Sequence, residues 1–331
     1  MRRSFYLLLI GALAAASGGG HAQSGWKPEK NVEIVIGSSA GTGPDRAARI
    51  MQRIWQEHKM VDVPAAVVNK PGGGGAISWA YLNQRAGDGH FLLITSYNIV
   101  TNHITGKSNL TYTDFTPISL LISEYIAYTV RADSPIRSVA DLIDTLKKDP
   151  GAVPVGISSS AGGANHIALG VFMKAAGIDL NKMKVVVFSG TNESLAALLG
   201  GHVGLWINSG SANAPPFTNG TSRPLAVAAP KRLGGIYASV PTLAELGFPV
   251  TANNWRLVIA PKGLSAAQTA YWDSTFRRLA TSEEWNKELE SNYFSNNYLG
   301  SADTRKYLDQ QYGEVKQILT EIGLARTPSG K

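Results

Sequence analysis

A short corner occurs twice in this sequence, and it limits the folds open to the chain. The stretches VIGSSAGTGPDRAARI (35–50) and VGISSSAGGANHIALG (155–170) share the tetrapeptide Ser-Ser-Ala-Gly, at 38–41 and again at 159–162. In both, an apolar run typical of a strand precedes the tetrapeptide, and a pattern typical of a helix follows it. A chain that repeats this strand–turn–helix corner is expected to contain two α/β units with similar openings.

The rest of the sequence continues the alternation of strands and helices. Strands are predicted at 31–37, 62–69, 89–96, 125–132, 152–158, 183–190, 203–210, 224–230 and 257–263. Helices are predicted at 44–58, 76–86, 138–151, 165–176 and 192–201, and the tail from 265 to 324 is predicted to be mostly helical. This order favours parallel sheets built from βαβ units. Because no Pro/Ser-rich linker separates the units, we expect two lobes joined by crossing strands.

The first residues have the pattern of a secretory signal peptide. Arg2 and Arg3 precede the apolar run FYLLLIGALAAA, and Gly20-His21-Ala22 offers small residues for cleavage after Ala22. The apolar run is too short for a transmembrane helix. The chain has no cysteine, which excludes a lipoprotein anchor, disulfides and thiolate catalysis. We therefore predict a signal peptide at 1–22 and a soluble periplasmic protein.

The charge balance favours a small anionic ligand over nucleic acid. Without Arg2 and Arg3, the 31 basic residues fall to 29 against 24 acidic ones, a net charge of +5. The sequence has no run of five basic residues, which is the pattern that would indicate a nucleic-acid-binding surface. The six histidines lack metal-ligand spacing, so we expect neither a metal nor a cofactor.

The two corners are candidate anion sites. A glycine-rich turn at the start of a helix offers backbone N–H groups, and the helix dipole adds partial positive charge there. In open α/β sheets such turns lie at the carboxyl ends of strands, where ligands bind. The predicted ligand-binding residues of the corners are Ser38, Ser39, Ala40, Gly41, Thr42 and Gly43, together with Ser158, Ser159, Ser160, Ala161, Gly162 and Gly163. Facing corners could grip a molecule that carries one or two carboxylates.

Three further side chains near these segments have more than one interpretation. Asp45 lies in the first turn of its helix and is a cap or dipole partner, or it orients the 38–43 loop. His166 has the matching place in the second corner, as a packing or capping residue or as a ligand contact. Trp255 is a core residue or an apolar wall near the crossing strands. We include all three among the candidate ligand-binding residues.

A serine hydrolase is the competing interpretation of the first corner. GSSAG (37–41) fits the nucleophile elbow G-x-S-x-G with Ser39 as nucleophile, and His166 or His202 follows later in the chain. Such enzymes need several strands and an oxyanion loop before the elbow, whereas only about a dozen residues precede it after the predicted cleavage. We therefore disfavour an esterase and predict no enzymatic activity.

A series of motifs carries a family resemblance. GWKPEKNVEIVIG, SSAGTGPDRAAR, NKPGGGGA, GDGHFLLIT, YTDFTPISLL, SSSAGGANHIAL, LAALLGGHV, SVPTLAELGFP and WRLVIAPKG occur in this order. Through them the chain resembles the substrate-binding proteins of tripartite tricarboxylate transporters, the TctC/Bug type, over nearly its whole mature length. The resemblance implies an α/β, two-lobed periplasmic-binding fold (Venus flytrap, type II-like), in which each lobe is a mostly parallel sheet flanked by helices. It places lobe 1 at 23–125 plus 252–331 and lobe 2 at 126–251.

The resemblance also implies a function. A carboxylate is expected between the lobes, held by backbone amides, hydroxyls and bridging waters, with Ser96, Tyr97, Asn98, Asn102, Phe188, Ser189 and Asn208 as further ligand-binding residues. The implied partners are a large and a small integral-membrane transporter subunit, served by a monomer that closes about a hinge. A periplasmic sensor that hands its closed form to a signalling receptor stays open as an alternative.

Departures from the family pattern bear on the ligand. Phe188-Ser189-Gly190 replaces the usual Tyr-Lys-Gly, Gly204 replaces an Asp, and Tyr97 and Trp206 add aromatic side chains nearby in the sequence. A pocket with less positive charge and more aromatic surface would suit an acid with an apolar body. The hypothesis is an aromatic, medium-chain or dicarboxylic acid.

Overall fold

The computed structural model describes residues 25–158 and 160–326; the predicted signal peptide, its cleavage site and Ser159 lie outside the described residues. The strands are β1 (Val32–Ile36), β2 (Ala65–Asn69), β3 (Phe91–Thr95), β4 (Phe115–Arg131), β5 (Val155–Ser158), β6 (Val185–Phe188), β7 (Leu205–Ser209), β8 (Ser222–Val227), β9 (Asn253–Pro261) and β10 (Ser295–Leu299). The helices are α1 (Gly43–Glu57), α2 (Ala76–Asn83), α3 (Asn98–Ile104), α4 (Val139–Lys148), α5 (Ala164–Ala176), α6 (Thr191–Leu199), α7 (Gly210–Thr218), α8 (Ala266–Thr281), α9 (Glu283–Ser291) and α10 (Ser301–Glu321).

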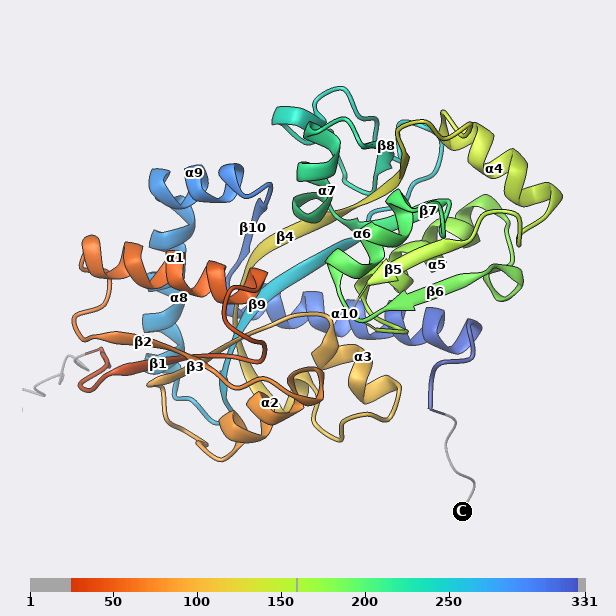
Figure 1. Cartoon of the computed structure of the whole chain (residues 1–331). Coiled ribbons are helices and arrows are strands. Elements are labelled where there is room, and N and C mark those ends of the chain that lie inside the picture. Colours follow the sequence, from red (N-terminus) through yellow and green to blue (C-terminus); the bar gives the residue numbers. More distant parts are fainter. Residues whose placement is uncertain (1–24, 159, 327–331) are drawn as a thin grey trace, which may run out of the picture.

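Two groups of parallel strands are joined through antiparallel ones. β2, β1 and β3 are parallel neighbours, and so are β7, β5 and β6. Between them lie β9 and β4, so the strand order is β2-β1-β3-β9-β4-β7-β5-β6, and β8 and β10 also pair with β4. Figure 1 shows β4 and β9 running side by side from one group to the other. This is the predicted α/β fold, with two lobes of mostly parallel sheet flanked by helices.

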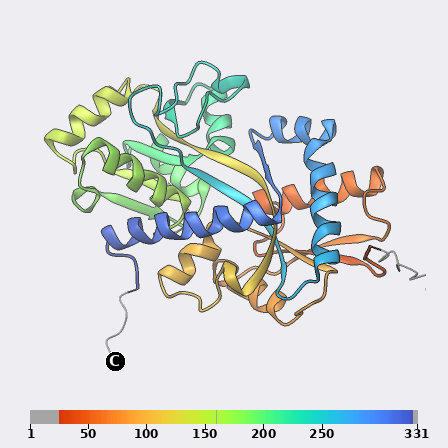
Figure 2. The same cartoon turned by 180° about the vertical axis from the view of Figure 1, so that it is seen from behind.

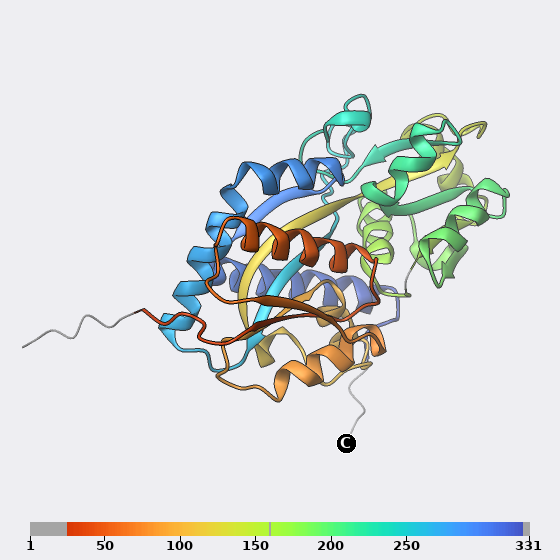
Figure 3. The ribbon, with the colours of Figure 1, turned by 60° about the vertical axis from the view of Figure 1, so that its left-hand side comes forward.

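Helices α1 and α2 cover opposite faces of the first sheet (Figure 3). Side chains alternate along a strand, so Ile34 of β1 packs in one core with Met51 of α1. Its neighbour Val35 packs in another core with Trp79 of α2. The carboxyl end of β1 leads into the loop before α1, which is the first Ser-Ser-Ala-Gly corner.

Strand β4 is 17 residues long and belongs to both groups of strands. Residues 115–125 pair with β9, whereas 126–131 pair with β7 and β8. The sequence predicts a strand only at 125–132, which is too short, because continuous burial and register shifts beside Pro117 hide the period-2 pattern of the first part. The lobe boundaries at 125/126 and 251/252 stay a prediction, and the change of partners along β4 favours the first of them.

Each half of the molecule has a large hydrophobic core of its own. One core is built entirely within 126–252 and includes Tyr128, Leu169 and Phe172. The largest core of the other half brings Trp55 of α1 against Trp272 of α8, with ring centroids 5.7 Å apart. Each half therefore buries much of its own apolar surface, although a third core joins α5 of one half to α3 and α10 of the other. Within residues 25–158 and 160–326, none of the helices is long and apolar enough to cross a membrane.

The C-terminal segment is helical, as predicted, except at β10, which pairs antiparallel with β4. The sequence analysis missed this strand, which begins two residues after Tyr293, a residue with a left-handed φ of 57°. Helix α10 then runs along the back of the molecule, where it contacts β4, α3 and α5 (Figure 2). It thus packs against elements of both halves.

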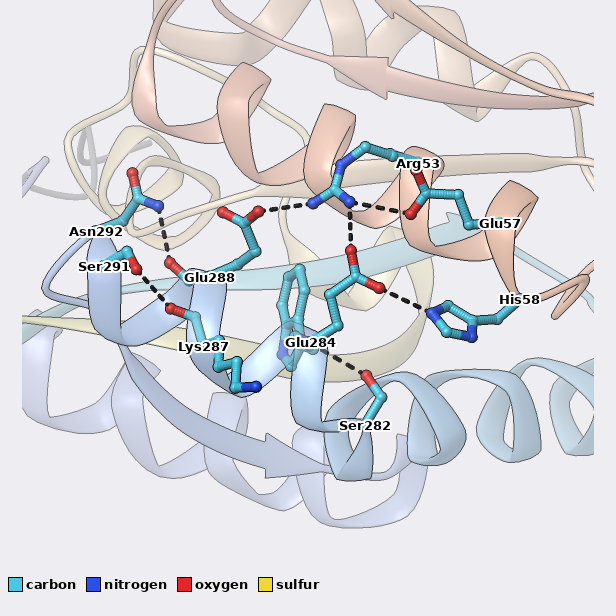
Figure 4. Close-up of polar contacts among 10 residues, drawn as sticks. Arg53, Glu57, His58, Ser282, Glu284, Lys287, Glu288, Ser291 and Asn292 are labelled. Atoms are coloured by element: carbon cyan, nitrogen blue, oxygen red, sulfur yellow. Dashed lines mark hydrogen bonds and ion pairs between the residues drawn. The ribbon is translucent and has the colours of Figure 1, made fainter.

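Charged side chains link α1 to α9 on the surface of the first half (Figure 4). Arg53 pairs with Glu57 at 3.0 Å, with Glu288 at 2.6 Å, and also with Glu284. The Nε2 atom of His58 lies 2.8 Å from Glu284. All of these groups are partly exposed, so each pair is expected to contribute less than about 1 kcal/mol.

Candidate functional site

A cavity of about 540 Å³ lies where the two groups of strands meet. The residues that line it are Ser38, Gly41, Thr42, Gly43, Pro44, Arg46, Ser96, Tyr97, Asn98, Glu124, Ser158, Gly163, Ala164, Asn165, Thr191, Asn192, Asn208, Ser209, Ser211, Ala212, Asn254 and Arg256. Most are polar, and both predicted corners contribute. They also include first-turn residues of four helices, α1, α5, α6 and α7.

These four helix starts share one property, which α2, α3 and α10 also have. In none of them does the side chain of the capping residue accept a hydrogen bond from a first-turn amide; the four capping residues are Thr42, Gly163, Gly190 and Ser209. By contrast, α4, α8 and α9 begin with Ser138, Ser265 and Ser282, whose hydroxyls cap the first turn. Uncapped amides and four helix dipoles that meet at one cavity make it a place for negative charge.

The first corner is held by the buried carboxylate of Asp45. Its Oδ2 accepts the amide N–H of Gly41 at 2.9 Å and Arg49 Nε at 3.0 Å, while Oδ1 accepts Asn69 Nδ2 at 3.0 Å. Burial raises the pKa of the Asp45 carboxyl, but the hydrogen bonds from Arg49 and Gly41 outweigh it and hold the pKa below its ordinary value. Asp45 therefore orients the 38–43 loop, which is one of the roles that the sequence suggests, and it does not line the cavity.

The second corner has the same geometry with a different acceptor. Gly41 and Gly162 both have φ of 80°, and the amide N–H of Gly162 donates to Nδ1 of His166 at 3.1 Å. Burial lowers the pKa of His166, which keeps the ring neutral and its Nδ1 able to accept. His166 thus orients its loop as Asp45 does, and it is not among the residues that line the cavity.

The floor of the cavity is formed by the crossing strands. Glu124 on β4 is opposite Asn254 on β9, and Arg256 lies two residues further on the same face. Arg256 Nη2 donates to Glu124 Oε2, and Ser211 at the start of α7 donates to Glu124 Oε1. Arg256 Nη1 also donates to the carbonyl of Asn254 at 3.1 Å. A buried ion pair therefore links β4 to β9 beneath the cavity, and Ser211 connects it to α7.

The structure brings about half of the predicted site residues together. Those that line the cavity are Ser38, Gly41, Thr42, Gly43, Ser96, Tyr97, Asn98, Ser158, Gly163 and Asn208. Those that do not are Ser39, Ala40, Asp45, Asn102, Ser160, Ala161, Gly162, His166, Phe188, Ser189 and Trp255. Ser159 lies outside the described residues. The cavity is thus lined by part of each corner loop rather than by the whole loop.

Strand alternation explains one correction. Trp255 is fully buried and packs against Tyr97, with ring centroids 5.0 Å apart. It supports a residue of the cavity from behind, because consecutive residues of β9 point to opposite faces. Asn254 and Arg256, which flank it, line the cavity instead, and the sequence analysis missed both.

The expected aromatic surface is mostly absent from the cavity lining. Of the three aromatic residues that motivated it, only Tyr97 lines the cavity. Trp206 is fully buried and donates its Nε1–H to Ser194 at 2.9 Å, in a small core that Phe188 also contacts. Ser189 donates to Glu193 at 2.6 Å. The starting residues of α6, Thr191 and Asn192, take the place expected for Phe188 and Ser189.

Two other predicted residues have supporting contacts. Asn102 donates from Nδ2 to the carbonyls of Gly73 and Gly74, at 3.3 and 3.4 Å, and so anchors the glycine-rich turn before α2. Ser39 is exposed, its carbonyl accepts the Thr42 hydroxyl at 2.8 Å, and its own hydroxyl has no histidine partner among the described residues. The arrangement gives no support to Ser39 as a nucleophile.

The residues that sequence reasoning missed are Pro44, Arg46, Glu124, Ala164, Asn165, Thr191, Asn192, Ser209, Ser211, Ala212, Asn254 and Arg256. Four of them could have been predicted from the sequence, because they lie in the first turns of the helices that follow the two corners: Pro44, Arg46, Ala164 and Asn165. Within the described ranges, no three His, Asp or Glu side chains are grouped in a way that could hold a metal ion.

Comparisons with known proteins identify the family. The family model of the tripartite tricarboxylate transporter family receptor, TctC, matches residues 48–324. The chain belongs to this family. It is a periplasmic binding protein of the TctC type, and this is a family of solute-binding proteins rather than enzymes.

Two sequence relatives cover most of the chain. One is the UPF0065 protein in gbd 5'region of Cupriavidus necator, 26% identical over 333 residues, 98% of this chain and 99% of the relative. The other is Protein BugT of Bordetella pertussis, 26% identical over 269 residues, 80% of each.

Solved structures agree on the fold. A TctC solute-binding protein from Polaromonas has a TM-score of 0.76 and 24% identity, over 89% of this chain and 99% of its own. Rpa4515 of R. palustris, solved with adipate, has a TM-score of 0.76 and 25% identity, over 90% of this chain and 99% of its own.

Proposed function

We propose that this protein captures a small molecule bearing a carboxylate between its two lobes, closes over it about a hinge, and delivers it to a tripartite tricarboxylate-type membrane transporter. The ligand is not altered. The partners are a large and a small integral-membrane subunit, and the binding protein acts as a monomer.

The observation that carries the proposal is the meeting of four uncapped helix starts at one cavity. An anion placed there accepts hydrogen bonds from backbone amides, and the helix dipoles need no reorientation to stabilise its charge. Arg46 adds a full positive charge to the lining. The adipate in the structure of Rpa4515 supports a carboxylate as the anion.

Hinge closure is expected because both lobes would contact the ligand. α1 supplies its first turn from one lobe, whereas α5, α6 and α7 supply theirs from the other. A ligand held by both sets gains its full binding energy only when the lobes approach, so binding favours the closed form. A transporter that recognises only the closed form would therefore interact with the ligand-bound protein.

A thermal-shift screen of carboxylates on the purified protein tests the proposal. Because the ligand binds only the folded form, a carboxylate at 100 times its Kd should stabilise the protein by about 2.7 kcal/mol. Isothermal titration calorimetry then gives the affinity and stoichiometry of each hit. The proposal is contradicted if no small carboxylate binds.

A matched pair of variants locates the bound anion. Ala164→Asp puts a carboxylate at the first residue of α5, inside the cavity, and should abolish carboxylate binding. Ala266→Asp makes the same change at the first residue of α8, outside the cavity, and should leave binding unchanged. Equal losses in both variants would place the anion elsewhere.

A further inference from the structure

The charged residues at the floor of the cavity restrict the chemical class of ligand that can bind there. Among the described residues that line the cavity, Glu124 is the only acidic one, and Arg46 and Arg256 are the basic ones. Glu124 and Arg256 are 4% and 7% exposed, so their charges are weakly screened by solvent. Whatever part of a ligand reaches this floor meets a fixed carboxylate.

The carboxylate of Glu124 is held in place from two sides. Its Oε2 accepts from Arg256 and its Oε1 from the hydroxyl of Ser211. The Ser211 hydroxyl is itself 3.1 Å from that of Ser209. Each carboxylate oxygen keeps a further lone pair, so Glu124 can accept further hydrogen bonds but cannot donate one while it is ionised.

The partner of Glu124, Arg256, is already engaged by the protein. Its Nη1 donates to the carbonyls of Asn254 and Trp255, at 3.1 and 3.3 Å, and its Nη2 to Glu124. Both Nη atoms of Arg256 therefore already donate within the protein, which leaves fewer donors for a second carboxylate of the ligand.

We propose that Glu124 is a specificity-determining residue, and that it selects a monocarboxylate carrying an ammonium or hydroxyl donor over a dicarboxylate. The carboxylate of the ligand lies among the four helix starts, and its donor group faces Glu124. A second carboxylate in that position would be repelled by Glu124 and would leave it without a donor. This inference rests on the proposed function, since it assumes that a carboxylate binds in this cavity.

The test compares matched ligands by isothermal titration calorimetry. The probes are unbranched monocarboxylates of three to six carbons with an ammonium or hydroxyl group at each position along the chain, and the dicarboxylate of each length. We expect the best amino or hydroxy acid to bind at least about tenfold more tightly than every dicarboxylate, as a hydrogen bond to a charged group implies.

Variants then assign the preference to Glu124. Glu124→Gln keeps the size of the side chain and should bring the two ligand classes within about threefold of each other. Because this change leaves Arg256 buried without its partner, the neutral double variant Glu124→Gln/Arg256→Gln serves as a second measurement, with folding checked by circular dichroism. Glu290→Gln, an exposed residue outside the cavity lining, makes the same charge change and should leave the preference intact.

The outcomes separate this inference from the function on which it rests. Binding of dicarboxylates as tightly as amino or hydroxy acids by the unmodified protein would overturn the role of Glu124 and leave the proposed function standing. An undiminished preference in the folded double variant would overturn it as well, because Glu124 would then only hold Arg256. Absence of binding by every probe would count against the proposed function itself.

Discussion

At the first corner the amide of Gly41 donates to a carboxylate, whereas at the second the amide of Gly162 donates to an imidazole. The two glycines have the same φ of 80°, and each acceptor lies four residues further along the chain. The supports differ, because Asp45 also binds Arg49 and Asn69. The same backbone is thus stabilised in one lobe by a charged network and in the other by a single neutral hydrogen bond.

This difference has a consequence for the two lobes. Removal of an acceptor with several donors takes the partner from all of them, whereas removal of a lone acceptor takes it from one. The acceptors also titrate in different pH ranges, since an ordinary carboxyl has a pKa of about 4 and an ordinary imidazole one of about 6.5. We expect the first corner to be the more rigid and the second to respond to mild acid.

The largest effect is expected from Asp45→Ala. It leaves the Gly41 amide, Arg49 and Asn69 without their acceptor, so the free energy of unfolding should fall by about 3 kcal/mol, with a loss of carboxylate affinity. Urea denaturation and calorimetry measure the two quantities. Asp45→Asn, which keeps one oxygen acceptor, should lose less, and an effect no larger than that of His166→Ala would remove the contrast between the corners.

The two glycines should differ when a methyl group is added. A Cβ on Gly162 would lie 3.1 Å from Leu319 Cδ2, whereas a Cβ on Gly41 meets nothing within 4 Å. Both changes strain a left-handed residue, so Gly41→Ala should cost about 1 kcal/mol and Gly162→Ala about 2 kcal/mol. Urea denaturation of both variants gives the comparison, and the reverse order would show that the second loop relaxes away from α10.

The pH dependence of the second corner is the next smaller effect. Because burial lowers the pKa of His166 in the folded protein, the unfolded chain binds a proton first as the pH falls. Stability is therefore present above the ordinary histidine pKa and is lost as the pH falls through the folded value. Carboxylate affinity measured by calorimetry from pH 7.5 to 5 should fall in the same range.

The matched variant for this effect is His166→Asn, whose amide oxygen can accept from the Gly162 amide without titrating. It should flatten the decline of affinity with pH. A decline of the same size in His166→Asn would assign the pH dependence to another group, since the pKa of Asp45 lies below this range.

The smallest effect on binding is expected from Ser138→Ala. This change removes the side-chain cap of α4, a helix outside the cavity lining, so the free energy of unfolding should fall by about 1 kcal/mol and carboxylate affinity should not change. Thermal unfolding with and without the best carboxylate measures both. Weaker binding in this variant would mean that helix starts remote from the cavity also affect the ligand.

The positions of the two corner loops could be predicted from the sequence, whereas the residues of the cavity floor could not. The strand–turn–helix pattern, the left-handed glycines at 41 and 162 and the acceptors four residues later are all local features, and they predict where the loops lie. Tyr97, Asn98 and Asn208 came from the family resemblance and do line the cavity. Phe188 and Trp255 lie outside the cavity lining, because sequence alone does not say which face of a strand meets the cavity.

By itself, then, the sequence determined the alternation of strands and helices, the two turns and the family, since short-range periodicity and turn chemistry are written in neighbouring residues. Only the tertiary structure decided that Glu124 and Arg256 meet, because these residues are 132 positions apart and are joined by the register of β4 against β9. A slip of either strand by one residue would send its side chain to the opposite face and separate the pair. The composition of the cavity floor is therefore a property of strand pairing.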